Sequence, residues 1–263
     1  MQPTAAGGIL LIDQLRCAAP WLEAPIAAIE RQLHVQLWAG RPWLAWRPII
    51  LSGPPGAGKS FLAQLVADLS GAGTATLDLG GTSDSRALEG TARGWSNSQP
   101  CWPAVMMAQT KTANPVLVLE EVDKAGSSPQ GGSAHHVLLT MTEKETARRY
   151  WDKCLLAEVD LSNICWLMTF NDASQLPPTL LSRVEVIEVE GPTIDDFELL
   201  LVSMIAHLAR AWEVPVASMP VLPGAAVASL KKVFATSQSA RRMRRHLESI
   251  YGSLIRFARR PTH

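Results

Sequence analysis

The chain has 263 residues, 47% of them hydrophobic and 18% charged, and its formal net charge is zero. This size and apolar content allow one large core or a core with a smaller one, and they exclude a disordered protein. The balanced charge gives no global attraction to nucleic acid or to a membrane. Four scattered cysteines without C-x-x-C spacing, with no signal-peptide or membrane-span pattern, favour free thiols and a cytoplasmic location.

Residues 1–47 precede the first predicted strand and are rich in tryptophan. Apolar spacing predicts a helix over residues 22–37, with Pro25 in its first turn, where proline is tolerated. Four tryptophans are expected to pack this segment onto the core or onto a neighbouring subunit. They are Trp21, Trp38, Trp43 and Trp46.

Residues 53–60 fit the pattern G-x-x-x-x-G-K-[ST] of a phosphate-binding P-loop. An apolar strand precedes them and helical apolar spacing follows. The glycines let successive N–H groups face an anion, Lys59 can reach the β- and γ-phosphates, and Ser60 can ligate Mg²⁺. The alternative is a Gly-Pro turn that fits by accident. The residues expected to bind ATP here are Gly53, Pro54, Pro55, Gly56, Ala57, Gly58, Lys59, Ser60 and Phe61.

Three elements are predicted after the P-loop helix. Residues 74–79 form a second strand, a helix extends to about residue 90, and residues 104–111 form a short helix. Residues 90–102 lie between the two helices and are rich in Gly, Ser and Asn, so they are expected to form an exposed loop.

The next apolar run, residues 115–119, ends in two acids, Glu120 and Glu121. Such a run is typical of a central parallel strand that delivers carboxylates to its carboxyl end. In a P-loop ATPase, Glu120 would help to hold Mg²⁺ through water, and Glu121 would polarise the attacking water. The alternative is a strand that ends in solvated acids.

Two further strands complete a predicted doubly wound α/β core over residues 48–191. Before them come a helix over residues 134–145 and a hairpin over residues 150–160. The strands are residues 164–170, which end at Asn171-Asp172, and residues 184–189, near a sheet edge. A short helix introduced by Pro177-Pro178 lies between them.

Strand signals end at about residue 192, and residues 192–263 are predicted to form a small all-helical lid domain. Helices are expected over residues 194–212 and 225–234, and Ser239 can cap a third helix. The third helix has apolar residues at alternating spacings of four and three. These are Met243, Leu247, Ile250, Leu254 and Phe257.

The ordered set of segments resembles an AAA+ ATPase module, and most closely the ATPase part of Lon proteases, over about residues 19–260. Besides the P-loop, the resemblance is carried by residues 79–84, residues 114–124 (NPVLVLEEVDK), residues 160–162 and residues 176–186 (LPPTLLSRVEV). It implies an ATP- and Mg²⁺-dependent homo-oligomeric ring, a hexamer, that threads or remodels a protein substrate.

The resemblance also implies roles for single residues. Asn171 lies at the sensor-1 position, where it would orient the lytic water, and Arg183 lies at the position of an arginine finger that reaches a neighbour's nucleotide. The alternatives are a turn residue and a surface ion-pair partner. Arg241 lies at the sensor-2 position, although the arginines that follow it up to residue 245 are also candidates.

Two further assignments come from the same resemblance. Residues 20–23, including Trp21 and Leu22, fall where Lon contacts adenine. Trp95 falls where Lon places the aromatic residue of its substrate-gripping pore loop, and the alternative is a core or interface tryptophan.

The sequence departs from the family in two positions and in extent. Glu120 replaces an aspartate, and its extra methylene moves the carboxylate roughly 1.5 Å, so turnover is expected to be slow. Ser96 replaces an aliphatic residue. Without a protease segment, a stand-alone motor is expected. A nucleotide-gated switch or scaffold stays open, as does a nucleic-acid loader supported by nine Lys or Arg against one acid in residues 231–263.

Overall fold

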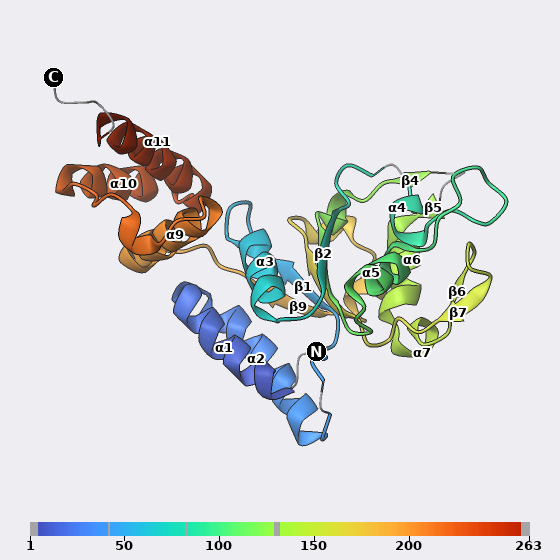
Figure 1. Ribbon diagram of the computed structural model, residues 1–263. Helices are drawn as coiled ribbons and strands as arrows, with labels where there is room; N and C mark the ends of the chain where they lie inside the picture. Colours follow the sequence, from blue (N-terminus) through green and yellow to red (C-terminus); the bar gives the residue numbers. More distant parts are fainter. Residues whose placement is uncertain (1–4, 42, 83, 129–131, 259–263) are drawn as a thin grey trace.

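The computed structural model describes residues 5–41, 43–82, 84–128 and 132–258, and a five-stranded sheet forms its centre (Figure 1). The strands of this sheet all run parallel, in the order β2-β3-β8-β1-β9. They are β1 (Ile49–Ser52), β2 (Thr74–Asp78), β3 (Val116–Glu120), β8 (Cys165–Thr169) and β9 (Glu185–Glu188). The predicted parallel sheet, with its last strand at an edge, is confirmed.

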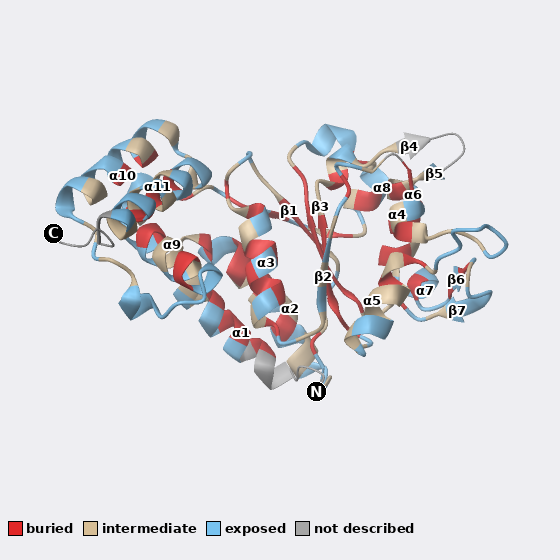
Figure 2. Cartoon of the chain, turned by 45° about the horizontal axis from the view of Figure 1, so that its top comes forward, coloured by how far each residue is buried: buried red, intermediate tan, exposed pale blue. Residues whose placement is uncertain are grey.

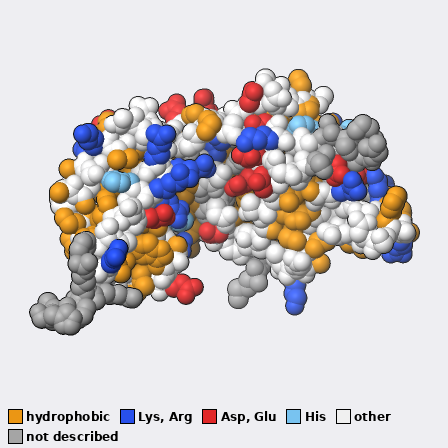
Figure 3. All heavy atoms as spheres, turned by 90° about the horizontal axis from the view of Figure 1, so that it is seen from above, with side chains coloured by type: hydrophobic (Ala, Val, Ile, Leu, Met, Phe, Trp, Pro, Cys, Tyr) orange, Lys and Arg blue, Asp and Glu red, His pale blue; other side chains and the backbone are white. Residues whose placement is uncertain are grey.

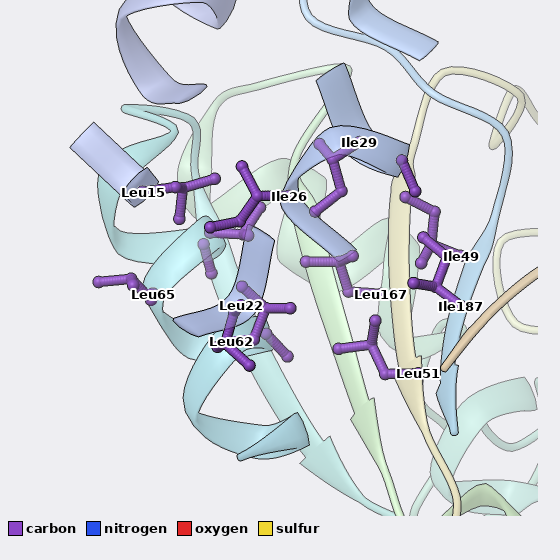
Figure 4. Packing of buried hydrophobic residues seen from close by; sticks show 14 of the residues in the cluster. Leu15, Leu22, Ile26, Ile29, Ile49, Leu51, Leu62, Leu65, Leu167 and Ile187 are labelled. Carbon is purple, nitrogen blue, oxygen red and sulfur yellow. The ribbon is translucent and has the colours of Figure 1, made fainter. Parts of the chain in front are cut away.

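Alternate residues of the central strands enter two different cores, so both faces of the sheet are covered. Ile49 and Leu51 pack with helices of one layer, as the close view in Figure 4 shows, whereas Ile50 packs with the other layer. The first layer holds α1 (Ala5–Ala18), α2 (Glu23–Trp38) and α3 (Lys59–Leu69). The second holds α4 (Arg86–Glu89), α5 (Trp102–Thr110), α6 (Ala134–Thr142) and α8 (Pro178–Leu181). Figure 2 shows the buried strands between these layers.

Helix α1 was not predicted, because two adjacent glycines and few polar residues hide its period. The structure gives one of these glycines a packing role. A Cβ atom on Gly8 would lie 3.4 Å from a methyl of Leu33 in α2, so this glycine faces the neighbouring helix and leaves room for little more than a Cβ atom. Leu11 and Leu15, one turn apart, are buried in the first layer.

Of the tryptophans before the sheet, some pack onto the core, and contact of the others with a neighbouring subunit stays a prediction. Trp46 is buried and its indole N–H donates to the carbonyl oxygen of Trp166. Trp38, however, is 89% exposed at the end of α2, and Trp43 is also exposed. Leucine and isoleucine side chains on the inward faces of α1 and α2 hold this segment on the core, together with Trp46 and the partly buried Trp21.

The lid is a separate helical cluster joined to the sheet by the segment after β9 (Figure 1). Its elements are η4 (Ile194–Asp196), α9 (Phe197–Ala211), η5 (Val216–Ser218), α10 (Gly224–Ser237) and α11 (Ala240–Ala258). Met243, Leu247 and Tyr251 of α11 are buried in it. The Ser239 hydroxyl accepts from the N–H of Arg242 at 3.3 Å and so caps α11. The side chain of Phe257 lies outside the described part of the chain. The domain limits at residues 47 and 191 stay a prediction.

Short elements complete the chain. The predicted hairpin is confirmed as β6 (Tyr150–Asp152) and β7 (Ala157–Val159). The helix expected before residue 90 is only the single turn of α4, and the helix expected over residues 134–145 divides into α6 and α7 (Lys144–Ala147). The others are η1 (Pro20–Leu22), η2 (Val122–Lys124), η3 (Ala173–Gln175), β4 (Ser127–Ser128) and β5 (Gly132–Ser133). Within the described part of the chain, no helix is both long and apolar enough to cross a membrane.

Candidate nucleotide site

The P-loop joins β1 to α3 and holds its glycines in conformations that other residues rarely adopt. Gly53 has φ 143°, and a Cβ atom there would lie 2.3 Å from the carbonyl oxygen of Val189. Gly58 has φ 105°, and a Cβ atom there would enter open space. In the described chain, the N–H groups of Gly56 and Gly58 have no acceptor. Together with the free N–H groups at the start of α3, they form a cradle of donors that fits a phosphate.

Lys59 is folded back onto this loop. Its buried ammonium donates to the carbonyl oxygens of Gly53 at 2.6 Å and Pro54 at 3.0 Å. Burial lowers the pKa of Lys59, and the charge of Asp123 acts in the opposite direction. To bind a phosphate directly, the ammonium has to exchange these carbonyl oxygens for phosphate oxygens.

The two acids lie at the carboxyl end of β3. In the sheet, β8 separates β3 from β1, the strand that leads into the P-loop. Glu120 is opposite Asp78 in the sheet register. Glu121 has φ 55°, a left-handed conformation that is unfavourable for a glutamate and is often found at functional sites. Its carboxylate lies 2.8 Å from the ammonium of Lys124. A Cβ atom on Gly80 would lie 2.3 Å from its other oxygen, so a larger residue there would displace the carboxylate.

The donor set fits Mg²⁺ held jointly with a phosphate rather than by protein alone. Among the described residues, no group of three or more His, Cys, Asp or Glu side chains is placed to hold a metal. Mg²⁺ is usually bound through one or two carboxylates plus substrate phosphates. Glu120 and Ser60 are the candidate ligands, and neither side chain has a hydrogen-bond partner in the described chain.

Asn171 follows β8, the strand between β3 and β1, so the sheet order brings it to the same edge as the P-loop and the acids. Its backbone N–H donates to Asp123 at 3.2 Å. Asp123 was not selected from the sequence, although it is the third acid of the Glu-Glu-Val-Asp run. The run alone could not show which of the three acids contacts Asn171.

Arg183 lies just before the amino end of β9, whereas the P-loop and the acids lie at the carboxyl ends of their strands. Its side chain forms an ion pair with Glu143 at 3.1 Å and donates to the carbonyl oxygen of Leu139 at 3.1 Å. The structure therefore does not bring Arg183 together with Lys59 within one chain.

Helix α6 contacts both the acid-bearing turn and Arg183. At its start, the Nε2 atom of His135 lies 2.7 Å from the carbonyl oxygen of Val122, between Glu121 and Asp123. One turn further on, Leu139 accepts the hydrogen bond from Arg183. One helix thus contacts both the turn that follows β3 and the residue that precedes β9.

An aromatic column joins the segment before the sheet, the P-loop helix and the lid. The rings of Trp21 and Phe61 are stacked with centroids 6.2 Å apart, and the Phe61 and His207 centroids are 5.1 Å apart. Leu22 is 1% exposed in the core, so only its backbone is available to a ligand. The column contains Trp21 and Phe61, two of the residues predicted from the sequence to contact the nucleotide.

The amino end of α11 lies beside the P-loop. A Cβ atom on Gly56 would be 3.9 Å from the hydroxyl of Ser239. Arg241, in the first turn of α11, is exposed and has no ion-pair partner among the described residues, whereas Arg244 pairs with Glu248 at 3.0 Å. Figure 3 shows basic side chains gathered on the lid and acidic ones near the middle of the same view.

Trp95 lies on a loop that is fastened to the β6–β7 hairpin. It is 69% exposed, and Trp151 on the hairpin is 56% exposed. The Arg93 side chain donates to the carbonyl oxygen of Cys154 at 2.9 Å, and Asp152 accepts from the N–H of Cys101 at 2.7 Å. Two segments that are distant in sequence are therefore held against each other, and each carries an exposed tryptophan.

The parallel sheet, the P-loop after β1 and the acids after β3 define a P-loop α/β core with an attached helical lid. Residues 49–191, more than half of the chain, match the ATPase family associated with various cellular activities (AAA), and the chain belongs to this family.

The chain is also similar to several Lon proteases, as the resemblance implied. It is 27% identical to the mitochondrial Lon protease homolog of Yarrowia lipolytica over 81% of this chain. It is 36% identical to Lon protease 4 of Sorangium cellulosum over 56% of this chain, and 35% identical to the Lon protease of Rhizobium meliloti over 57%. Each match covers only 18% of the relative's length.

Proposed function

We propose that this module hydrolyses ATP within a ring of identical subunits, a hexamer, and uses the reaction to thread or remodel a protein substrate. We assign no peptide-bond cleavage to it. The observation that carries the proposal is the meeting of three segments at one sheet edge: the P-loop after β1, the acids after β3 and Asn171 after β8.

The proposed chemistry follows from the positions of the side chains. Bound Mg²⁺ would supply positive charge that polarises the phosphates, with Ser60 and Glu120 as its protein ligands. Lys59 would neutralise charge on the β- and γ-phosphates, and Glu121 would accept hydrogen bonds from the attacking water. Asn171 would orient that water.

Arg183 is proposed to complete the site of the next subunit, because it lies at the far sheet edge of its own chain. A positive charge delivered there would stabilise the transferred phosphoryl group only in the assembly. Arg241, at the start of α11, would contact the phosphates from the lid, and Trp21, with the backbone of Leu22, would contact the base.

Two substitutions test the assignment of the phosphate site. Lys59→Ala removes the P-loop cation and is expected to weaken binding of a fluorescent ATP analogue more than about tenfold, as the loss of a charged contact does. Glu121→Gln keeps the shape of the acid and is expected to bind the analogue normally but not to turn over ATP. Lys232→Ala, at an exposed position on α10, is the matched control. Wild-type affinity in Lys59→Ala contradicts the proposal.

A nucleotide-gated switch or scaffold is the second candidate function. It is favoured by the longer Glu120 side chain and by the ion pair that holds Glu121. Steady-state turnover measured against oligomer size separates the two functions. Assembly on ATP with almost no turnover supports the switch, whereas turnover that rises with assembly supports the motor.

A nucleic-acid loader has weaker support, from the exposed arginines at positions 241, 242, 244 and 245 of α11. A DNA-binding titration at several salt concentrations tests it, because phosphate contacts make affinity fall steeply with salt. Binding that is absent at low salt rejects this function.

A further inference from the structure

Asp123 joins the ends of two neighbouring strands at the nucleotide edge of the sheet. It lies in η2, two residues after Glu121, and its Oδ2 atom accepts hydrogen bonds from the backbone N–H groups of Asn171 at 3.2 Å and Asp172 at 3.1 Å. The regular pairing of β3 with β8 has already ended at Leu119 and Met168. The carboxylate therefore continues the connection between the strands beyond the last pair of the sheet.

The two N–H groups depend on this one carboxylate. The N–H of Phe170 still has a partner in the sheet, because it donates to the carbonyl oxygen of Leu51 at 3.1 Å. For Asn171 and Asp172, the described chain offers no acceptor other than Asp123. Without it, both N–H groups would be left to solvent, and the backbone that carries the Asn171 side chain would lose its fixed position.

The second oxygen of Asp123 takes no part in this hold. Oδ1 is buried and has no hydrogen-bond partner among the described residues. A buried carboxylate oxygen without a donor is unfavourable, and a neutral asparagine would hold the two N–H groups equally well. The contacts of Asp123 thus point to the sensor-1 segment.

We infer that Asp123 is a positioning residue of the ATPase site, which holds the backbone of residues 171 and 172 so that the Asn171 side chain faces the nucleotide. The inference rests on the proposed ATP hydrolysis. In this role Asp123 touches neither phosphate nor water. It acts through Asn171.

The experiment compares three variants of the full chain. Asp123→Leu has a similar shape but no acceptor, and Asp123→Asn keeps one oxygen for the two N–H groups. Asp160→Leu is the control. Asp160 precedes the amino end of β8, and its carboxylate accepts a hydrogen bond from the backbone N–H of Ser162 at 2.9 Å. It therefore stabilises a comparable turn, but at the end of the sheet away from the P-loop. The measurements are kcat, the Kd for a fluorescent ATP analogue, and hydrogen exchange at the amides of residues 171 and 172.

Asp123→Leu is expected to lower kcat at least about tenfold while the Kd changes less than about threefold. Its amides at 171 and 172 should exchange faster than those of the wild type. Asp123→Asn should restore amide protection and most of kcat. In the background of Asn171→Ala, Asp123→Leu should cause little further loss, since both changes remove the same function.

Several results would overturn the inference. They are a wild-type kcat in Asp123→Leu, additive losses in the double variant, or the same loss in Asp160→Leu. If Asp123→Leu does not fold, amide protection in Asp123→Asn decides the point, because unprotected amides there contradict the proposed hold. Failure of the proposed function gives a different pattern: the wild type itself shows no turnover, while the effect on amide exchange is still measurable.

Discussion

The ammonium of Lys124 lies 2.8 Å from a carboxylate oxygen of Glu121, three residues earlier in the same turn. The acid proposed to polarise the attacking water is therefore held by its own neighbour in this structure. Because both side chains are partly exposed, the ion pair is weak, and Glu121 can exchange Lys124 for another partner.

Lys124→Met should free Glu121 and raise ATP turnover in the absence of a protein substrate. The gain is expected to be at most about fivefold, because exposed ion pairs contribute little. Turnover is measured at saturating ATP, with Lys232→Met on the lid as the control for losing a lysine. A lower turnover would mean that Lys124 assists the reaction instead of restraining the acid.

Arg183→Ala should leave ATP binding by the isolated subunit unchanged and remove turnover in the assembly. The reason is that the guanidinium lies across the sheet from its own P-loop. Glu143→Gln is the matched control, since it breaks the ion pair at 3.1 Å but keeps the arginine, and it should retain turnover.

Mixing the Arg183→Ala and Lys59→Ala chains tests the action between subunits directly. Mixed rings should regain part of the activity, because some interfaces then combine an intact P-loop with an intact arginine. If verified mixed rings stay inactive, Arg183 does not act on a neighbour.

Trp95→Ala should leave folding, assembly and basal turnover near wild type and remove stimulation by a protein substrate. The indole is 69% exposed, so its truncation removes little buried area. Trp38→Ala, which is 89% exposed on α2, is the control and should keep the stimulation. A buried tryptophan would cost ~3–5 kcal/mol on truncation, so a large fall in melting temperature would assign Trp95 to packing.

His207 should make the stability of the protein sensitive to acid. Burial lowers the pKa of His207, as do Arg210 and Arg244, whereas Asp68 raises it. The unfolded chain therefore binds the proton more readily, so stability is complete above the ordinary histidine pKa of about 6.5 and is lost as the pH falls below it.

His207→Gln, which is neutral at every pH, should reduce the fall in melting temperature between neutral pH and mildly acidic pH. The exposed His136→Gln serves as the control. An unchanged acid sensitivity in His207→Gln would show that another group carries it.

The parts of the site that follow from local sequence were predictable. The P-loop needs glycine at fixed positions, and the apolar run before Glu120 identifies a central strand, so both elements and their shared edge were found. Gly8 shows the opposite case, since it lies inside helix α1 and faces α2, although a glycine looks like a helix breaker in the sequence.

Contacts made by the turn after Glu121 could not be predicted. Lys124 contacts Glu121, and Asp123 contacts the backbone of Asn171. Both contacts depend on the left-handed backbone at Glu121, and glutamate gives no signal for that conformation. Likewise, Trp38 is a large apolar residue but lies on the outer side of α2. The inner side is filled by leucine and isoleucine.

Helix α6 has nine residues and is therefore about 13 Å long, and it carries two contacts that lie one turn apart. His135 fixes one end to the turn that carries Glu121 and Asp123, and Leu139, one turn on, holds Arg183. A small rotation of that turn would tilt the helix and displace Arg183, the arginine proposed to act on a neighbouring subunit. In the proposed ring, the acids and the arginine of one chain would then move together, because the same helix contacts both.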